Sequence, residues 1–366
     1  MKQGWEIKKL GEVCTIERGG SPRPIQNYIT DAEDGINWIK IGDATEGSKY
    51  ITSTKEKIKP EGMKKSRFVH KGDFILSNSM SFGRPYILAV DGCIHDGWLV
   101  IHDNDNRFDK NYLYYYLGSP NIYTEFKRLA VGGVVNNLNS ELVRNVKVCI
   151  PPLPVQEKIV EELDCLSGII EKKREQLKEL DALAESIFYQ MFGDPITNEK
   201  GWEVKKFDEC YKLASGNGLS AKDIIDGIYP VYGGNGIVGH HHEFNLDGNN
   251  IIIGRVGALC GNVRNVIGKA FITDNAFILT KKIENDNTFL LYLLRIHNLR
   301  KYAREAMQPV VSNAGVKNIA IIIPSLALQQ EFADKIEAIE KQKELIKQSI
   351  TETEELFNSR MDYYFN

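Results

Sequence analysis

The chain has 366 residues, with 46 lysines and arginines against 49 aspartates and glutamates, which gives a formal net charge of −3 at pH 7. This length is enough for two domains that each bury a core. The six cysteines form no Cys-x-x-Cys pair, no signal-like apolar segment opens the chain, and apolar runs such as 319–323 are far too short to cross a bilayer. These features predict a cytoplasmic protein without a membrane segment, a disulfide framework or a zinc site.

An internal repeat divides the chain. The segment Trp-Glu-Ile-Lys-Lys at 5–9 returns as Trp-Glu-Val-Lys-Lys at 202–206, an offset of 197 residues. The segment Pro-Leu-x-x-Gln at 152–156 aligns with Ser-Leu-x-x-Gln at 325–329, an offset of 173. Such a repeat predicts one fold used twice, related by a pseudo-twofold axis. The unequal offsets predict that the first globular half is about 24 residues longer than the second.

Short apolar segments between Gly- and Asn-rich turns predict strands in both halves. These strands are expected at 36–41, 74–76, 99–101 and 146–150 in the first half and at 251–253, 277–279 and 319–323 in the second. Helices are predicted at 112–117 and 289–299, and we interpret the Tyr-Tyr-Tyr run at 114–116 as core and helix surface rather than as a base-stacking platform. Each half is therefore predicted to be an α+β (mixed α/β) domain. Weaker echoes align 111–115 with 288–292 and 81–84 with 254–257.

A long helix with a heptad pattern is predicted after each globular half. Apolar residues recur at alternating spacings of four and three, which is typical of a coiled-coil seam. They are Ile159, Leu163, Leu166, Ile170, Leu177, Leu180 and Ile187 in the first helix and Phe332, Ile336, Ile339, Ile346, Ile350 and Phe357 in the second. A lysine interrupts each seam, at Lys173 and Lys343, and the usual role of such a residue is to fix register. We expect the two helices to pair antiparallel.

The helices are acidic, whereas the globular halves are mildly basic. Lys+Arg minus Asp+Glu is +3 for residues 1–150, −5 for 151–200, +3 for 201–323 and −4 for 324–366. These four segments are the predicted first domain, central helix with its linker, second domain and C-terminal helix. A mild positive charge on a domain is compatible with a nucleic-acid partner and also with ordinary solvated surface.

Motifs for catalysis and metal binding are weak. The Gly-x-Gly-x-x-Gly at 234–239 has the dinucleotide spacing, but a His-His-His run rather than a helix follows it, and adjacent histidines on a loop do not converge on one metal ion. Asp194, Glu203 and Lys205 could belong to a metal-dependent nuclease, although their spacing is loose. No phosphate-loop sequence for ATP is present. The sequence therefore predicts no catalytic residue, no metal ligand and no cofactor in this chain.

The combination of motifs resembles the specificity subunits of Type I restriction-modification enzymes. The resemblance rests on the duplicated Trp-Glu segments, on Ile-Lys-Ile-Gly-Asp at 39–43, on Tyr-Pro-Val-Tyr-Gly-Gly-Asn-Gly at 229–236 and on the Leu-x-x-Gln segments that open the helices. It implies two target-recognition domains, at 1–150 and 201–323, that each read one half of a split double-stranded DNA target. The helices at 151–200 and 324–366 would act as spacer and docking platform. The shorter second domain and Ser325 in place of Pro152 depart from a regular duplication.

The resemblance also implies partners. Two modification (methyltransferase) subunits would transfer a methyl group from S-adenosylmethionine, and restriction subunits would use ATP and Mg²⁺ for translocation and cleavage, so these cofactors would belong to the partners. A specificity subunit that serves modification alone, without a restriction partner, fits the sequence as well. Two interpretations from other classes stay open: a metal-dependent nuclease and a coiled-coil assembly protein without DNA contact.

Side chains in the loops are the candidates for reading DNA, because Arg pairs with guanine and Asn or Gln pairs with adenine in the major groove. The candidates for base contacts are Asn78, Ser81, Arg84, Asn136 and Asn137 in the first domain and Asn235, Arg255, Asn262, Arg264 and Gln308 in the second. Arg18, Lys40 and Lys212 are predicted to contact phosphates, which position a protein without specifying sequence. Solvated surface or turn chemistry is the alternative for each residue. Because the domains differ, we expect an asymmetric split target with half-sites about one helical turn apart.

Overall fold

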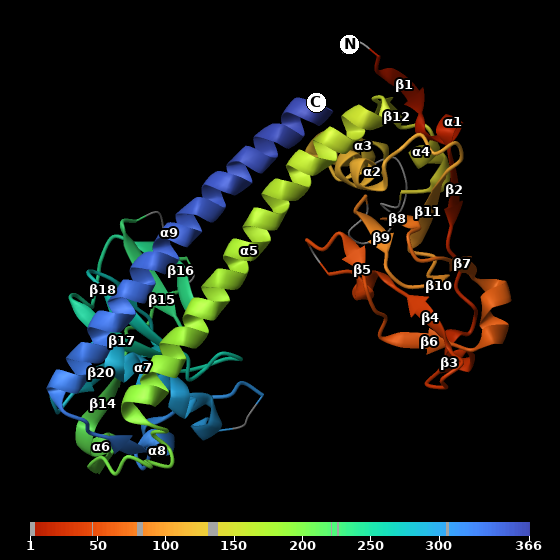
Figure 1. Cartoon of the computed structure of the whole chain (residues 1–366). Helices are drawn as coiled ribbons and strands as arrows, with labels where there is room; N and C mark the ends of the chain where they lie inside the picture. Colours follow the sequence, from red (N-terminus) through yellow and green to blue (C-terminus); the bar gives the residue numbers. More distant parts are fainter. Residues whose placement is uncertain are drawn as a thin grey trace. The chain divides into compact units, whose positions relative to one another are not determined.

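The computed structural model describes residues 4–45, 47–78, 83–130, 138–220, 222–224, 227–304 and 307–366. The chain divides into two compact units, Met1–Lys172 with Ile350–Asn366, and Lys173–Ser349. Each unit contains one globular domain, which we call the first domain (residues 4–150) and the second domain (residues 201–323), together with parts of two long helices (Figure 1). Within the described ranges, no helix combines the length and the apolar character needed to cross a membrane.

The main sheet of the first domain is buried on both faces. Its strand order is β2 (Cys14–Arg18), β11 (Trp98–Asp103), β8 (Phe74–Ser77), β9 (Pro85–Leu88) and β5 (Tyr50–Ile51). Because successive side chains of a strand point to opposite faces, Phe74 and Leu76 pack with helix α2 (Lys110–Leu117), whereas Ile75 packs toward a second sheet. The predicted strands at 74–76 and 99–101 are confirmed. The interpretation of the tyrosine run at 114–116 as core and helix surface is also confirmed, since Tyr115 and Tyr116 are buried in the core.

The second sheet of the first domain is made of short strands in the order β3 (Ile29–Thr30), β6 (Glu56–Ile58), β4 (Ile36–Ile39), β10 (Gly92–Ile94) and β7 (Arg67–Val69). The strand predicted at 36–41 ends at Ile39 because the Lys40 N–H donates to the Asp43 carboxylate at 2.8 Å, which opens the 3₁₀ helix η2 (Ile41–Asp43). The other elements are β1 (Glu6–Lys9), α1 (Leu10–Val13), η1 (Ile25–Asn27), η3 (Pro60–Lys65), α3 (Pro120–Ala130), α4 (Ser140–Arg144) and β12 (Lys147–Ile150), which pairs antiparallel with β1.

The second domain repeats this plan with fewer strands. Its main sheet has the order β14 (Tyr211–Ser215), β20 (Ala276–Lys281), β17 (Asn249–Gly254) and β18 (Val263–Ile267), and its second sheet is β16 (Gly236–His241), β15 (Tyr229–Gly233) and β19 (Phe271–Ile272). The other elements are β13 (Val204–Lys206), α6 (Phe207–Cys210), α7 (Asn287–His297), η4 (Leu299–Tyr302), α8 (Asn313–Val316) and β21 (Ala320–Ile322), which pairs with β13. β15 pairs with β19 in parallel, as β4 does with β10. Strands β3, β5 and β7 are the additions of the longer first domain.

Hydrogen bonds test the two weak sequence echoes. Asp109 caps α2 by accepting from the N–H groups of Asn111 and Tyr112, and Asp286 caps α7 by accepting from those of Thr288 and Phe289. The alignment of 111–115 with 288–292 is therefore confirmed. The alignment of 81–84 with 254–257 is wrong: the Gly83 N–H donates to the Ser77 carbonyl at 2.7 Å, as the Gly261 N–H does to the Gly254 carbonyl at 2.7 Å. Gly83 thus corresponds to Gly261.

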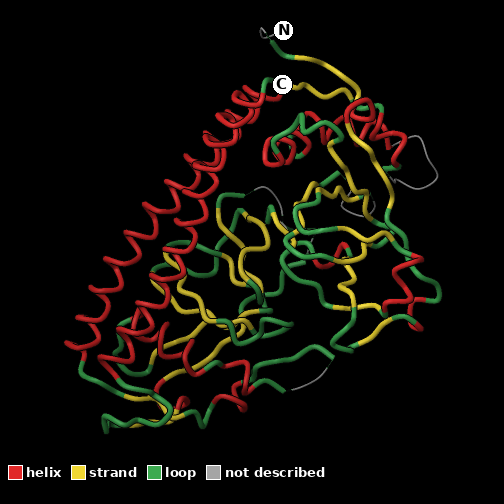
Figure 2. Tube along the Cα trace, turned by 45° about the vertical axis from the view of Figure 1, so that its right-hand side comes forward, coloured by secondary structure: helices red, strands yellow, loops and turns green. Residues whose placement is uncertain are grey.

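The long helices α5 (Leu153–Phe192) and α9 (Leu326–Phe365) run side by side (Figure 2). In the first unit Arg360 and Tyr364 of α9 bind the Glu162 carboxylate of α5. In the second unit the Lys343 ammonium lies 2.7 Å from an Asp181 oxygen. In the second unit Lys173 of α5 also contacts Ser349 of α9, so residue numbers rise along α5 as they fall along α9, which confirms antiparallel pairing there. Every residue predicted for the two seams is buried or half-buried.

Each long helix also presents a second apolar face to a domain. In the first unit Val160 and Phe365 join the core around Tyr112. In the second unit Phe188 and Phe192 are fully buried, with ring centroids 5.5 and 5.4 Å from that of Phe332. Phe188 and Phe192 lie outside the predicted seam, and a heptad pattern alone does not reveal them.

A buried glutamine ties the start of each long helix to its domain. Gln156 donates to the carbonyls of Arg107 and Pro151, both at 2.8 Å, and its Oε1 accepts from the Asp109 N–H at 2.9 Å. In the second unit Gln329 donates to the Pro324 carbonyl at 2.9 Å and accepts from the Asp286 N–H at 2.9 Å. Both glutamines are almost completely buried. The last residue of the duplicated Leu-x-x-Gln segment therefore joins the long helix to the N-cap of α2 or α7.

We expect Gln156→Leu and Gln329→Leu each to lower the free energy of unfolding by about 1–3 kcal/mol, because leucine fills the space but leaves buried backbone groups without a hydrogen-bond partner. Gln176→Leu, at an exposed position of α5, is the matched control. Urea denaturation of the three variants measures the differences. Equal stabilities for all three would show that the glutamines do not hold the helices to the domains.

Candidate nucleic-acid interface

Corresponding loops of the two main sheets carry several of the candidate residues. The loop between β8 and β9 begins at Asn78, and the loop between β17 and β18 begins at Arg255. The Asn78 N–H donates to the Gly97 carbonyl and its carbonyl accepts from the Leu138 N–H, both at 2.9 Å, while its side chain donates to the Asp96 carbonyl. In the same way, the Arg255 N–H donates to the Asn275 carbonyl and its carbonyl accepts from the Val311 N–H, both at 2.9 Å, while its side chain donates to the Asp274 carbonyl. Asn78 and Arg255 therefore occupy equivalent positions.

The far ends of these loops also match. The Ser77 N–H donates to the Arg84 carbonyl at 3.0 Å, and the Gly254 N–H donates to the Asn262 carbonyl at 2.9 Å. Arg84 and Asn262 are therefore equivalent as well. Both loops are held by the same backbone hydrogen bonds, whereas the side chains at their ends differ in shape and charge.

Asp96 organises the charged side chains beside the first loop. Its carboxylate lies 3.8 Å from Arg18 and 3.5 Å from Arg23, and it accepts from the Ser21 hydroxyl at 2.8 Å. Burial alone would raise the pKa of Asp96, but the Ser21 hydrogen bond and the nearby positive charges outweigh burial and hold that pKa below its usual value. Burial lowers the pKa of His95, whose Nε2 lies 3.0 Å from Asp96. Arg18 is exposed, and its charge is shared with an ionised carboxylate.

Lys40 lies in the wall of a cavity of about 860 Å³ in the first domain, with Trp38 and His95 among its neighbours. Its ammonium forms an ion pair with Glu56. Because the Glu56 carboxylate offsets the charge of Lys40, this lysine would attract a phosphate only weakly. Lys212 is exposed on β14, three residues before Ser215.

The remaining first-domain candidates have different environments. Asn78 is 3% exposed, and its amide already donates to the Asp96 carbonyl at 3.0 Å, so it holds the loop rather than facing solvent. Arg84 is half-buried at the far end of the same loop. Ser81, Asn136 and Asn137 lie outside the described residues.

Five of the six second-domain candidates, all except Lys212, come together at one edge of the domain. Arg264 of β18 donates to the Asn235 carbonyl at 3.0 Å, at the exposed turn between β15 and β16. Gln308 is exposed beside Pro309, whose carbonyl accepts from the Gly257 N–H at 3.1 Å. These contacts place Asn235, Arg255, Asn262, Arg264 and Gln308 around the β17–β18 loop.

A glycine allows two of these loops to pass each other. A Cβ on Gly234 would lie 2.8 Å from the Val256 carbonyl oxygen and 3.0 Å from that of Asn275. Any other residue at 234 would push the β15–β16 turn away from the β17–β18 loop. The Gly-x-Gly-x-x-Gly segment is thus the turn of a hairpin and the first residues of β16.

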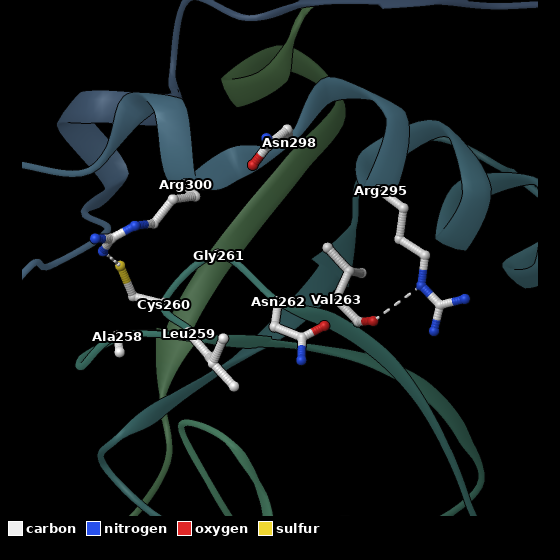
Figure 3. Close-up of a pocket in the computed structure, with 9 residues that line it drawn as sticks. All are labelled: Ala258, Leu259, Cys260, Gly261, Asn262, Val263, Arg295, Asn298 and Arg300. Carbon is white, nitrogen blue, oxygen red and sulfur yellow. Dashed lines mark hydrogen bonds between the residues drawn. The ribbon is translucent and has the colours of Figure 1, made fainter. Parts of the chain in front are cut away.

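Two arginines that the sequence analysis missed also reach this edge. The Arg300 guanidinium donates to the Cys260 sulfur at 2.9 Å, and Arg295 Nε donates to the Val263 carbonyl at 3.3 Å. Figure 3 shows them at opposite ends of a pocket of about 240 Å³, with Asn262 and Asn298 between them. A basic residue in the last turn of a helix usually interacts with the helix dipole, so its position alone gives no sign of a site.

The residues considered for a nuclease do not form a cluster of metal ligands. Glu203 and Lys205 pair with each other at 3.2 Å, and Asp194 accepts from the Ile196 N–H at 2.8 Å. Among the residues that the structure describes, no group of three His, Cys, Asp or Glu side chains is arranged to hold a metal ion.

Comparison with known proteins assigns this arrangement to a family. The family model for the Type I restriction modification DNA specificity domain matches residues 2–181 and again residues 199–355. The chain belongs to this family. Its members are specificity subunits, which recognise DNA and are not catalytic. The two matched ranges correspond to the two repeats.

Individual relatives agree with this assignment. The chain is 26% identical to the EcoprrI specificity subunit of Escherichia coli over 96% of its own length and 90% of that protein. It is 25% identical to the MjaIX specificity subunit of Methanocaldococcus jannaschii over 60% of its length and 54% of that protein. Two solved structures are similar. The S subunit of the Type I restriction-modification system from M. genitalium gives a TM-score of 0.59 at 14% identity, and the match covers 98% of this chain and 95% of that chain. A structure from a study of complex assembly and conformational transition of the type I restriction-modification system gives a TM-score of 0.62 at 18% identity, and the match covers 100% of this chain and 98% of that chain. At these identities, the structures show a shared fold.

His297, between Arg295 and Asn298, is a buried base. It is 3% exposed, neither ring nitrogen has a hydrogen-bond partner among the described residues, and burial lowers its pKa from the ordinary 6.5, with the Asp194 charge acting weakly in the opposite direction. The folded chain therefore keeps this ring neutral below pH 6.5, where the unfolded chain binds a proton. Stability contributed by this residue is lost as the pH falls below 6.5.

We expect His297→Leu to reduce the loss of stability between pH 7 and pH 5, by at most about 1.4 kcal/mol per pH unit for a single group. The measurement is urea denaturation of wild type and variant across this range. His242→Leu, which changes an exposed histidine, is the control and should follow the wild type. A pH dependence unchanged by His297→Leu would contradict the assignment.

Proposed function

We propose that the chain is the DNA sequence-specificity subunit of a Type I restriction-modification system and that it reads an asymmetric bipartite target in double-stranded DNA. The first domain (1–150) would read one half-site and the second domain (201–323) the other. The observation that supports this is the pair of corresponding loops, which share backbone hydrogen bonds but begin with Asn78 or Arg255 and end with Arg84 or Asn262.

The side chains at these positions match different bases. A guanidinium can donate two hydrogen bonds to guanine, and a carboxamide can pair with adenine. Arg255 and Asn262 are half-buried at the ends of the second loop, whereas in the first loop only Arg84 is half-buried and Asn78 is buried. Loops of the same design that present different donors would select different half-sites, so the combined target would not be palindromic.

The long helices are the proposed docking surface for two modification subunits and for restriction subunits. Apolar side chains on their outer faces support this function, since Leu183 and Leu345 are 48% and 67% exposed in the second unit, and Leu356 and Tyr363 are 50% and 59% exposed in the first. S-adenosylmethionine, ATP and Mg²⁺ would be bound by these partners. A system with modification subunits alone would use the same surfaces.

The proposal is tested by assembling the chain with the modification subunits of its own system and mapping the methylated sites. The expected result is one motif with two unlike specified parts and an unspecified gap between them. A continuous or palindromic motif would contradict the proposal. Cleavage of DNA by the purified chain with Mg²⁺ alone would instead support a nuclease.

We expect Arg255→Ala to weaken recognition of one half-site by about 1–3 kcal/mol and to relax the motif at one position there, because a bidentate contact to a base edge is lost. The other half-site should be unchanged. Arg128→Ala, which removes an exposed arginine paired with Glu125 on α3, is the control. A methylation motif unaltered by Arg255→Ala would remove this residue from the reading surface.

A further inference from the structure

We propose that Arg264, Arg295 and Arg300 of the second domain form a phosphate-binding stripe, which contacts the DNA backbone beside the β17–β18 loop. The proposal rests on the function inferred above and adds a site to it. It assigns a role to Arg295 and Arg300, and it gives Arg264 a phosphate contact in place of a base contact.

The arginines of this region lack anionic partners in the described part of the chain. Arg255, Arg264, Arg295 and Arg300 donate only to neutral acceptors, and no ion pair within 4.0 Å joins any of them to a described carboxylate. The acceptors are the Ser215 hydroxyl, the Cys260 sulfur and the backbone carbonyls of Asp274, Asn235 and Val263. Four positive charges are therefore gathered around one loop without an ion pair to a described carboxylate, although the charges of Glu340 and Asp181 still act on Arg295.

Most arginines of the first domain, in contrast, form ion pairs with carboxylates. Five of them lie within 4.0 Å of a carboxylate: Arg18, Arg23, Arg67, Arg107 and Arg128. Arg144 is an exception, since it donates to the Ile16 carbonyl at 2.7 Å. Pairing with a carboxylate is thus common among the arginines of the first domain, whereas the four arginines around the β17–β18 loop share the lack of such a partner within the described ranges and are open to an anion supplied from outside.

Arg264 and Arg295 lie close enough for their like charges to repel each other. Burial of the Arg295 guanidinium lowers its pKa and the charge of Arg264 acts in the same direction, while Tyr292, Glu340 and Asp181 act in the opposite direction without outweighing burial. Both side chains nevertheless remain charged, as arginines do in proteins. Arg264 Nε is buried and has no hydrogen-bond partner among the described residues. An anion near this pair would relieve the like-charge repulsion and provide an acceptor.

The shape of the pocket favours an extended anion over a compact one. Arg300 and Arg295 lie at its two ends, and the amides of Asn262 and Asn298 lie between them (Figure 3). A row of donors of this kind can contact successive phosphates of one strand. A single small anion would reach only one end of the row.

Gly261 brings Arg300 to the loop. A Cβ on this residue would lie 2.5 Å from the Arg300 backbone nitrogen, and its φ of +84° favours glycine. In the first domain the equivalent Gly83 packs against Phe126, whose ring would lie 2.9 Å from the added Cβ. The stripe is thus specific to the second domain, where Arg300 of η4 lies beside the glycine that in the first domain contacts Phe126 of α3.

The test uses the chain assembled with its modification subunits and a duplex that carries the mapped target. Affinity is measured at several salt concentrations for wild type, Arg300→Gln and Arg264→Gln. Each variant should make the slope of log affinity against log salt shallower by about 0.9, the value for one lost phosphate contact. The same weakening should occur on a duplex with the second half-site scrambled, and the methylation motif should stay unchanged.

Arg128→Gln, which removes an arginine already paired with Glu125, is the matched control and should leave the slope unchanged. Melting temperatures establish that the variants fold. If Arg264→Gln does not fold, Arg300→Gln, at an exposed position, still provides the test. A slope like that of the wild type, or an altered motif, would overturn the stripe alone. A wild-type assembly without sequence-specific binding would overturn the proposed function and the stripe with it.

Discussion

The buried glutamine at the start of each long helix is the constraint on which the rest of each unit depends. Gln156 joins the start of α5 to the N-cap of α2, and Gln329 joins the start of α9 to the N-cap of α7, through hydrogen bonds of almost completely buried side chains. With its first turn fixed in this way, a long helix directs one apolar face to the domain. Its seam then faces the other long helix. A rotation of either helix would break the buried hydrogen bonds, which are costly to leave unmade.

Duplication has preserved this backbone framework while its side chains have changed. The hydrogen bonds that start and end the β8–β9 loop recur at the β17–β18 loop, although Asn78 stands where the second domain has Arg255. Backbone hydrogen bonds do not depend on the identity of the side chain, which is buried at Asn78 and half-buried at Arg255. A family that must read many sequences can therefore vary these positions without altering the fold that carries them.

The two domains differ most in how they neutralise charge. In the first, Asp96 holds Arg18 and Arg23, and Glu56 pairs with Lys40. In the second, the arginines around the β17–β18 loop have only neutral acceptors among the described residues. Their net charges, counted over the sequence, are nevertheless the same. Local pairing, rather than total charge, decides where a polyanion is attracted.

The repeat, the antiparallel helix pair, the mixed α/β class and most of the strands could be predicted from the sequence, because duplicated segments and heptad and alternating patterns are local and survive in any context. The sequence also identified the loops that hold the candidate residues. Only the tertiary structure showed that Asn78 is buried, that Gly83 corresponds to Gly261, and that Arg295 and Arg300 reach the β17–β18 loop. These facts depend on contacts between segments far apart in the chain, and such contacts leave no periodic pattern in the sequence.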